Sequence, residues 1–265
     1  MDERPISPVL KVLAAIMFLF MLAPVLVVIP ISFSADNDMR FPPSGWSLRW
    51  YAAIFHDAGM VSAFRTSLGL GIVTTVLSML FALPCAYALV RLRPRGADLL
   101  ASVFTAPLLL PSIVLGLALL VVFARLGLLA TFQGVLAAHL IITLPYAIRV
   151  LSTALANLPP AAEEAAATLG APPLATFIHV TLPMMRGGLV ATAALCFLVS
   201  FDEVVLSLFM TGPRLTTLPV AMFHHIENAA DPLVAAVSML LIVLTFAVVL
   251  VVDRAAGLTR TFAKS

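Results

Sequence analysis

Residues 157–183 read NLPPAAEEAAATLGAPPLATFIHVTLP, a segment of helix-forming and turn-forming residues between two long apolar runs. The adjacent prolines Pro159 and Pro160 suit the first turn of a helix, where a missing N–H is tolerated. Glu163 and Glu164 follow in that turn, where the positive end of the helix dipole stabilises negative charge. Residues 161–169 are nearly all strong helix formers. Gly170 can adopt the left-handed conformation that ends a helix, and the prolines after it stop continuation. We therefore predict a helix over 161–169, a turn at Gly170 and a second short helix over 174–180.

The composition indicates an integral membrane protein. Of the 265 residues, 62% are hydrophobic and 11% are charged, whereas a soluble domain carries about a quarter charged residues. Most of this surface therefore cannot face water. The formal net charge of +2 is too small to indicate binding to nucleic acid. We expect one polytopic domain surrounded by membrane lipid.

Six apolar runs are long enough for a membrane span, which takes about 20 residues. They lie at roughly 10–31, 62–90, 99–123, 133–152, 186–210 and 233–252. The first run is longer than the roughly 7–15 apolar residues of a signal peptide, so we interpret it as an uncleaved span. Prolines in the third and fourth runs predict kinks, which membrane helices tolerate when neighbours satisfy the freed carbonyls. The predicted fold class is an all-α integral membrane protein with six transmembrane helices.

The basic residues predict the orientation of the spans. An even number of spans puts both termini on one side, and the segments on that side hold ten of the 15 Lys and Arg residues. The connection RLRPR at 91–95 is the most one-sided loop. Because inner loops of membrane proteins carry an excess of Lys and Arg, we expect both termini and residues 157–183 to be cytoplasmic.

The segment 157–183 also carries a spaced motif. Its members are Glu164, Ala165, Ala166, Gly170, Val180, Leu182 and Pro183. The order Glu-Ala-Ala, three residues, Gly, nine residues, an aliphatic residue, one residue and Leu-Pro resembles the EAA loop of ABC importer permeases, with Val180 in place of Ile. The resemblance implies a coupling helix, in which these residues and Glu163 dock on a cytoplasmic ATPase. The alternative is an amphipathic loop helix that only connects two spans.

Two acidic residues, Asp202 and Glu203, interrupt the fifth apolar run. At about 1.5 Å per residue, Asp202 would lie roughly 24 Å from Arg186, beyond the membrane midplane toward the outer side. A charged side chain deep in the bilayer costs about 2.5–3.5 kcal/mol and by default marks a functional site. Neighbours in sequence cannot point in one direction, so one can line a pathway while the other pairs with a neighbouring helix. The alternative is an acidic pair that only braces the helix bundle.

The residues around this pair extend the resemblance. The matching positions are Ser200, Asp202, Glu203, Val204, Val205, Phe209, Thr211, Gly212 and Pro213. They resemble the signature of permeases of spermidine/putrescine importers, the second permease subunit more than the first, and the similarity runs from about Trp50 to the C-terminus. It implies a type I ABC importer permease fold and a polyamine-like organic cation as substrate. The implied pathway residues are Asp202, Glu203, Ser200 and Phe209.

The resemblance also implies the partners of the chain. In such importers a second permease subunit completes a heterodimer, a dimer of cytoplasmic ABC ATPases binds ATP and Mg, and an extracytoplasmic solute-binding protein delivers substrate. The sequence has no G-x-x-x-x-G-K-[ST] loop, so we expect no cofactor in this chain and no enzymatic activity of its own. The expected location is the bacterial inner membrane. Related permeases for amino acids, opines, phosphonates, iron or thiamine are the alternatives for the substrate.

The expected domain organisation follows from the spans and the resemblance. An N-terminal span with an outer loop occupies 1–61, an ABC type-1 permease core occupies 62–252 and a cytoplasmic tail occupies 253–265. The main rival is an ion-driven secondary transporter, which inverted repeats with paired broken helices would favour, and no convincing repeat is present. A membrane-embedded hydrolase would carry a motif such as H-E-x-x-H or G-x-S-x-G, and neither occurs.

The outer loop, about residues 32–60, is polar and rich in turn-forming residues, with Trp46, Trp50 and Tyr51 close together. An aromatic belt on a short interfacial helix is the simpler interpretation. Contact with an extracytoplasmic docking partner is the alternative.

The histidines and cysteines do not form a ligand set in the sequence. His139 has no companion at ligand spacing, so packing or a hydrogen bond is predicted. His224 and His225 would point about 100° apart in a helix. No third ligand accompanies them, so no metal site is predicted. Cys85 and Cys196 are predicted to be small buried apolar residues rather than a disulfide.

Overall fold

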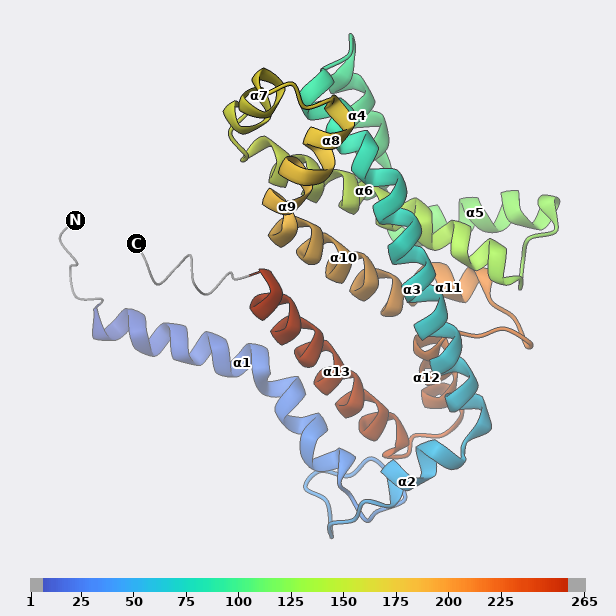
Figure 1. Ribbon diagram of the computed structural model, residues 1–265. Helices are drawn as coiled ribbons and strands as arrows, with labels where there is room; N and C mark the ends of the chain where they lie inside the picture. The colour runs from blue at the N-terminus through green and yellow to red at the C-terminus, as the bar shows by residue number, and fades with distance from the viewer. Residues whose placement is uncertain (1–6, 257–265) are drawn as a thin grey trace. The chain divides into compact units, whose positions relative to one another are not determined.

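The computed structural model describes residues 7–256, which form helices over most of their length (Figure 1). The long helices are α1 (Pro8–Ser32), α3 (Ala58–Tyr87), α6 (Phe132–Ala156), α10 (Arg186–Phe201) and α13 (Leu233–Ala256). The shorter helices are α2 (Arg49–His56), α4 (Ala97–Thr105), α5 (Ser112–Leu126), α7 (Ala161–Thr168), α8 (Pro173–Thr176), α9 (Leu182–Met184), α11 (Val205–Met210) and α12 (Leu218–Asn228). The π-helical turns η1 (Ala88–Leu92) and η3 (Phe177–Thr181) and the 3₁₀ turn η2 (Ala106–Leu109) extend them. The predicted all-α class is confirmed. Residues 257–265, most of the predicted tail, lie outside the described chain.

The chain divides into two compact units. Among the described residues, the first contains residues 7–61 together with Met222–Leu244. The second contains Ser62–Ala221 together with residues 245–256. Both the segment 157–183 and the acidic pair belong to the second unit, so their geometry can be described within one unit.

Four helical stretches of the described chain are long and apolar enough to cross a membrane: α1, α3 together with η1, α6 and α13. Two bent pairs raise this number to six if each pair is one span. The first pair joins residues 97–109 to α5 at an angle of 98°, and the second joins residues 173–184 to α10 at 75°. Each of the six predicted apolar runs therefore overlaps one of these helices or pairs, although the bounds differ and the pair that overlaps the fifth run begins at Pro173.

The third predicted span is not one straight helix. A residue that precedes proline is disfavoured in the α region. Leu110, which precedes Pro111, is accordingly extended, with φ −87° and ψ 137°. The chain turns there by 98° between residues 97–109 and α5. In contrast, α6 continues through Pro145 as one α-helix.

The prediction of one continuous helix over 186–210 is wrong. α10 ends at Phe201 and α11 begins at Val205, so the acidic pair and Val204 lie outside both helices. The side chain of Glu203 accepts a hydrogen bond of 2.9 Å from the N–H of Leu206 in the first turn of α11. A carboxylate that satisfies the free N–H groups of a helix start favours a new helix over continuation of the old one.

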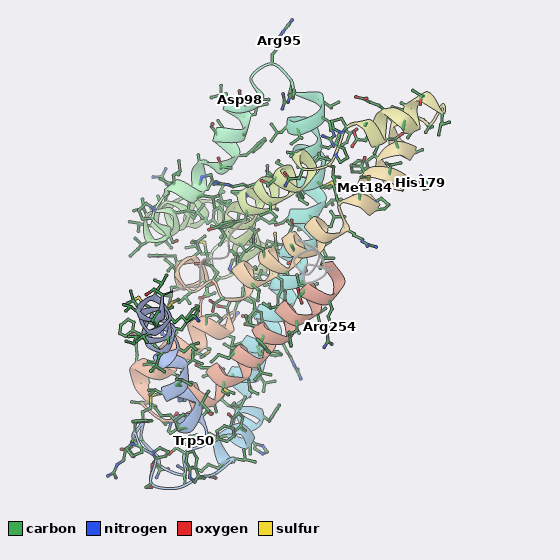
Figure 2. All side chains as sticks on the ribbon, turned by 90° about the vertical axis from the view of Figure 1, so that its left-hand side faces the viewer. Trp50, Arg95, Asp98, His179, Met184 and Arg254 are labelled. Carbon is green, nitrogen blue, oxygen red and sulfur yellow. The ribbon has the colours of Figure 1, made fainter. Side chains whose placement is uncertain are left out.

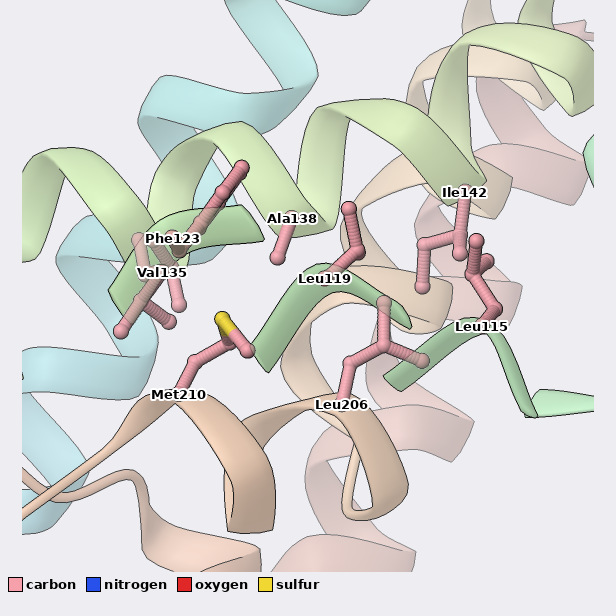
Figure 3. Packing of buried hydrophobic residues seen from close by; sticks show 9 residues of the cluster. Leu115, Leu119, Phe123, Val135, Ala138, Ile142, Leu206 and Met210 are labelled. Atoms are coloured by element: carbon pink, nitrogen blue, oxygen red, sulfur yellow. The ribbon is translucent and has the colours of Figure 1, made fainter. Parts of the chain in front are cut away.

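The core of the second unit lies where α5 packs against α6 and α11. Figure 3 shows Leu119 of α5, Ala138 of α6 and Met210 of α11 among its buried side chains. Lipid chains are as apolar as these residues, so close, shape-matched contact holds membrane helices together. Gly116 allows such contact, because a Cβ there would lie 2.5 Å from Cδ2 of Phe209.

α10 and α6 also approach each other through small residues. A Cβ added at Gly188 of α10 would lie 2.5 Å from the Cβ of Ala154 of α6. Real Cβ atoms do not come this close, so glycine is required for the observed spacing. Since α10 follows the segment 157–183 directly, this contact connects that segment to the helix bundle.

The outside of the long helices is apolar. Figure 2 shows mostly carbon along them, with Arg95 at the tip of the loop between η1 and α4 and Asp98 near the start of α4. Large side chains of α1 are exposed, including Phe18 at 67% and Phe20 at 77%. A surface of this kind suits lipid or another membrane chain rather than water.

Candidate functional site

The EAA segment, residues 157–183, folds as a helix, a left-handed turn and a second helix. α7 covers Ala161–Thr168, and Gly170 has φ +85°, so the predicted first helix and glycine turn are confirmed. The N–H of Ala171 closes the turn by donating to the carbonyl of Ala166 at 3.1 Å. The second helix is longer than predicted, because α8, η3 and α9 follow one another and Pro183 sits in the first turn of α9, where its missing N–H is tolerated.

The carboxylate of Glu163 points into the protein and holds the EAA segment to the end of α3. The Nε of Arg91, in η1, lies 3.1 Å from Oε1 and 3.0 Å from Oε2 of Glu163. Thr181 donates a hydrogen bond of 2.9 Å to Glu163 Oε1, and Arg91 Nη2 donates to the carbonyl of Leu158 at 3.2 Å. The side chains of the ion pair are only 13% and 17% exposed. Solvent therefore screens this pair less than it screens a surface pair.

Glu164 faces the other way and is exposed, as are Ala165, Gly170 and Pro183 among the motif residues. Ala166, Val180 and Leu182 are half-buried. Two leucines outside the motif add apolar surface to the same segment, since Leu169 is 88% exposed and Leu174 is 70% exposed. The EAA segment thus exposes the carboxylate of Glu164 and the side chains of Leu169 and Leu174 on its surface. The carboxylate of Glu163 is instead bound to Arg91 within the protein.

The acidic break, residues 202–204, separates the roles of its two carboxylates. Glu203 is half-buried and bound to the start of α11, as described above. Asp202 is exposed, and its carboxylate has no hydrogen bond or ion pair within the described chain. The expectation that the two neighbours face different surroundings is confirmed, although the partner of Glu203 is a backbone N–H rather than a neighbouring helix.

The other two predicted pathway residues are directed into the packing. Ser200 is 3% exposed and hydrogen-bonds to Nδ1 of His139 at 2.9 Å. Phe209 is half-buried, and its ring covers Gly116. Of the four residues predicted for a pathway, Asp202 is the exposed one.

The structure gives two groups at these sites partners that the sequence does not identify. The sequence marks Arg91 only as a basic loop residue, but it pairs with Glu163 across 72 positions of sequence. His139, for which packing or a hydrogen bond is predicted, forms hydrogen bonds to Ser200 and Ser207, 61 and 68 positions away. Such long separations leave no local signal, so only the fold could reveal these contacts.

His224 and His225 pair with nearby carboxylates, whereas His179 bonds to the carbonyl of Ala175. His224 Nδ1 lies 3.4 Å from Glu227, and His225 Nε2 lies 3.0 Å from Asp231. Within residues 7–256, no group of three or more His, Cys, Asp or Glu side chains gathers where it could hold a metal ion. Both cysteines are free, with Cys196 buried and Cys85 half-buried.

The outer loop is an ordered segment around Asp36. The hydroxyl and N–H of Ser44 bind its carboxylate, and the indole N–H of Trp50 donates to its backbone carbonyl at 3.2 Å. These hydrogen bonds from Ser44, the hydroxyl first, lower the pKa of Asp36 below its ordinary value. Trp46 stays 71% exposed, and Met39 N–H donates to the carbonyl of Ala230 in the same unit.

Comparisons with known proteins identify the family. Residues 76–259 match the family described as "Binding-protein-dependent transport system inner membrane component". The chain is 33% identical over 251 residues to the putrescine transport system permease protein PotI of Escherichia coli K12, covering 91% of this chain and 89% of PotI. It is 28% identical over 235 residues to the spermidine/putrescine transport system permease protein PotC of the same strain, covering 88% of each. It is also 30% identical over 250 residues to the putative 2-aminoethylphosphonate transport system permease protein PhnV of Salmonella paratyphi A, covering 92% of this chain and 93% of PhnV.

Two solved structures share the fold. A bacterial ABC transporter involved in the import of the acidic polysaccharide alginate has a chain that matches with a TM-score of 0.67 at 19% identity, covering 93% of this chain and 94% of that one. The MetNI methionine ABC transporter in an inward-facing conformation matches with a TM-score of 0.62 at 19% identity, covering 74% and 94%. The helical fold, the apolar spans and the sequence similarity agree. The chain therefore belongs to the family of multi-pass inner-membrane components of binding-protein-dependent transport systems.

Proposed function

We propose that this chain is the permease subunit of an ATP-driven importer of polyamine-like organic cations. The observation that carries the substrate proposal is the carboxylate of Asp202, which is exposed at a helix break and has no partner among the described residues. The chain is also similar to putrescine and spermidine permeases over most of its length. The chain itself is a transport subunit and not an enzyme, and a separate ATPase supplies the energy.

The charge of Asp202 explains the preference for a cation. A carboxylate within a membrane span is unfavourable by about 2.5–3.5 kcal/mol unless water, a cation or a protein group compensates it. A polyamine brings ammonium groups, which form strong charge-assisted hydrogen bonds with carboxylates. Because Glu203 is already bound to the backbone of α11, Asp202 is the carboxylate available to such a substrate.

We place the EAA segment in the cytoplasm, where it docks on the ATPase. Support comes from the distribution of basic residues and from the exposed surface formed by Glu164, Leu169 and Leu174. ATP and Mg belong to the ATPase, and both termini of this chain lie on the same side.

The network around Glu163 transmits the movement of the docked ATPase. Since Glu163 is bonded both to Arg91 at the end of α3 and to Thr181 in η3, a push on α7 moves both attachment points together. The close contact of Gly188 with Ala154 passes the displacement from α10 to α6. A loosely attached loop would instead absorb the same push without moving the spans.

The proposed assembly has three partners. A second permease subunit completes the pathway as a heterodimer, a dimer of ABC ATPases binds the two EAA segments, and a solute-binding protein delivers substrate on the outer side. The exposed apolar side chains of α1 are available to lipid or to the second permease. The family description itself names dependence on a binding protein.

Uptake of labelled putrescine into proteoliposomes that contain the whole importer tests this function. Glu203→Gln keeps an oxygen that can accept from Leu206, so it is expected to have a small effect. Asp202→Asn removes the free charge and is expected to lower uptake by about tenfold, equal to about 1.4 kcal/mol of lost binding. Asp98→Asn, at an exposed aspartate of α4, is the matched control and should leave uptake unchanged. Normal uptake by the double variant Asp202→Asn with Glu203→Gln would exclude the proposed role of the acidic pair.

A further inference from the structure

The imidazole of His139 bridges the two helices that flank the acidic break, α10 and α11. It is fully buried in α6, and its two nitrogens bind hydroxyls on opposite sides of the break. Nδ1 lies 2.9 Å from Oγ of Ser200 in the last turn of α10, and Nε2 lies 3.0 Å from Oγ of Ser207 in the first turns of α11. One side chain thus connects both halves of the broken helix to a third helix.

The hydrogen bonds continue from His139 to α3. Thr143 Oγ1 donates to the carbonyl of His139 at 2.8 Å, and Ser78 Oγ lies 2.7 Å from Thr143 Oγ1. The five residues of this hydrogen-bonded series are all buried, and the most exposed is Ser200 at 3%. They are Ser78, His139, Thr143, Ser200 and Ser207. In an apolar interior each polar group must find a partner, so a connected set of this kind fixes the relative positions of the helices that carry it.

The break needs such a connection because its own residues do not supply one. The carboxylate of Glu203 caps α11 locally, but it does not attach α11 to α10. α11 packs on α5 and α6 through Leu206 and Met210, and α10 packs on α6 near Gly188. His139 therefore adds the polar connection beside the break itself. Asp202 lies between α10 and α11, so its position depends directly on the angle between them.

We infer that His139 is the positioning residue of the acidic break, which holds α10 and α11 at the angle that presents the Asp202 carboxylate to the substrate. This inference rests on the proposed function of Asp202. His139 does not touch the substrate itself, since it is fully buried and both ring nitrogens are engaged. It acts through the two serines.

A distance measurement across the break tests the inference without any substrate. Spin labels at Leu195→Cys in α10 and Leu208→Cys in α11 are introduced after replacement of Cys85 and Cys196 by alanine. In a single straight helix these positions would lie about 20 Å apart. The wild-type His139 should give one narrow distance distribution. His139→Gln, whose amide offers an N–H donor group and a carbonyl acceptor where neutral imidazole offers one donor and one acceptor nitrogen, should keep it. His139→Leu, which offers neither, should broaden it or shift it toward about 20 Å.

The same variants are then assayed for ATPase copurification and putrescine uptake. His139→Leu should keep the ATPase but lose roughly ten- to a hundredfold in uptake, because small misplacements of an acting group have effects of this size. His139→Gln should restore most of the uptake. Thr192→Val is the control, since Thr192 is equally buried in α10 but its hydroxyl bonds, among the described residues, to the carbonyl of Gly188 in its own helix.

An unchanged distance distribution in His139→Leu would overturn the inference, and so would equal losses of uptake in His139→Leu and Thr192→Val. If His139→Leu fails to fold, Ser207→Ala decides in its place, with broadening expected and an unchanged distribution contradicting the inference. Broadening without any loss of uptake would support the connection through His139 and contradict the transport role of Asp202. The two proposals can therefore fail separately.

Discussion

The guanidinium of Arg91 lies 3.0 Å from the carboxylate of Glu163 and thereby joins η1, which continues α3, to the first turn of α7. The EAA segment is in this way part of the helix bundle rather than a loop hanging from it. The two glutamates of its first turn have different tasks, because Glu163 faces inward and Glu164 faces outward. Substitutions of Glu163 are therefore expected to affect the attachment of the EAA segment, whereas substitutions of Glu164 affect its exposed surface.

Reversal of either charge of the Arg91–Glu163 pair should uncouple the permease. A partly buried charged group that loses its partner costs about 1–3 kcal/mol. ATP-driven uptake by Arg91→Glu or Glu163→Arg should therefore fall about tenfold. The double exchange should restore part of it, since the pair is rebuilt while the carbonyl of Leu158 then faces a carboxylate. Arg95→Glu, at the exposed loop tip in Figure 2, is the control and should behave as the wild type. A double exchange that performs worse than both single variants would contradict the pairing.

Gly170→Ala should weaken ATPase docking without creating a clash. The left-handed conformation is unfavourable by about 1–2 kcal/mol for a residue with a Cβ. Gly170 has φ +85°, and apart from its chain neighbours no heavy atom of the described residues lies within 4 Å of the position that a Cβ would take, so conformational strain is the expected effect. Gly96→Ala is a matched control, with φ +82° and the same open surroundings in the neighbouring loop. Pull-down titrations with the ATPase should show weaker binding for Gly170→Ala and unchanged binding for Gly96→Ala. If Gly170→Ala binds the ATPase as tightly as the wild type does, the turn at Gly170 does not shape the docking surface.

Gly188→Ala should destabilise the contact between α10 and α6. The added methyl would approach Ala154 Cβ to 2.5 Å, and overpacking of this kind costs about 1–3 kcal/mol. Thermal unfolding in detergent should show a lower midpoint, and Ala154→Gly in the same chain should recover it. Gly69→Ala serves as the control, since no heavy atom of the described residues outside its own stretch of α3 lies within 4 Å of a Cβ there. A midpoint unaffected by Gly188→Ala would mean that the two helices are free to separate.

The outer loop should lose its structure in acid. Because the hydrogen bonds from Ser44 lower the pKa of Asp36, ionised Asp36 stabilises the folded loop above its unfolded pKa of about 3.8. That contribution disappears as the pH falls through the lower pKa of the folded loop. Replacement of Trp46 by Phe leaves Trp50 as the single tryptophan, and its fluorescence should change in this acid range. If Asp36→Asn shows the same change of Trp50 fluorescence in acid, the change arises from protonation of another group and contradicts this prediction.

The sequence is sufficient for the helical class, the apolar runs and the EAA motif, because these depend on hydropathy and local spacing. It also locates the first helix and the turn at Gly170, where proline, alanine and glycine act within a few residues. It does not predict where the helices of the third and fifth spans are interrupted. Pro111 breaks the third by restricting Leu110, and the carboxylate of Glu203 starts a new helix inside the fifth.

The contacts that organise the two sites are beyond local reasoning for a different reason. Arg91 with Glu163 and His139 with Ser207 join residues about 70 positions apart, and their pairing depends on which helices lie side by side. Ser200 and Phe209 are predicted as pathway residues because they flank an acidic pair in a familiar motif. Which side of a helix faces a neighbour is set by packing, and the structure directs both of them inward.

Photo-crosslinking in inner-membrane vesicles tests most directly whether the EAA segment faces the cytoplasm and contacts the ATPase, on which the proposed function depends. A benzophenone amino acid replaces Leu169, which is 88% exposed on the EAA segment, or Trp46, which is 71% exposed on the outer loop. We expect a covalent adduct with the ATPase from position 169 and none from position 46. An adduct from position 46, or none from position 169 while ATP-driven uptake proceeds, would contradict the proposed coupling.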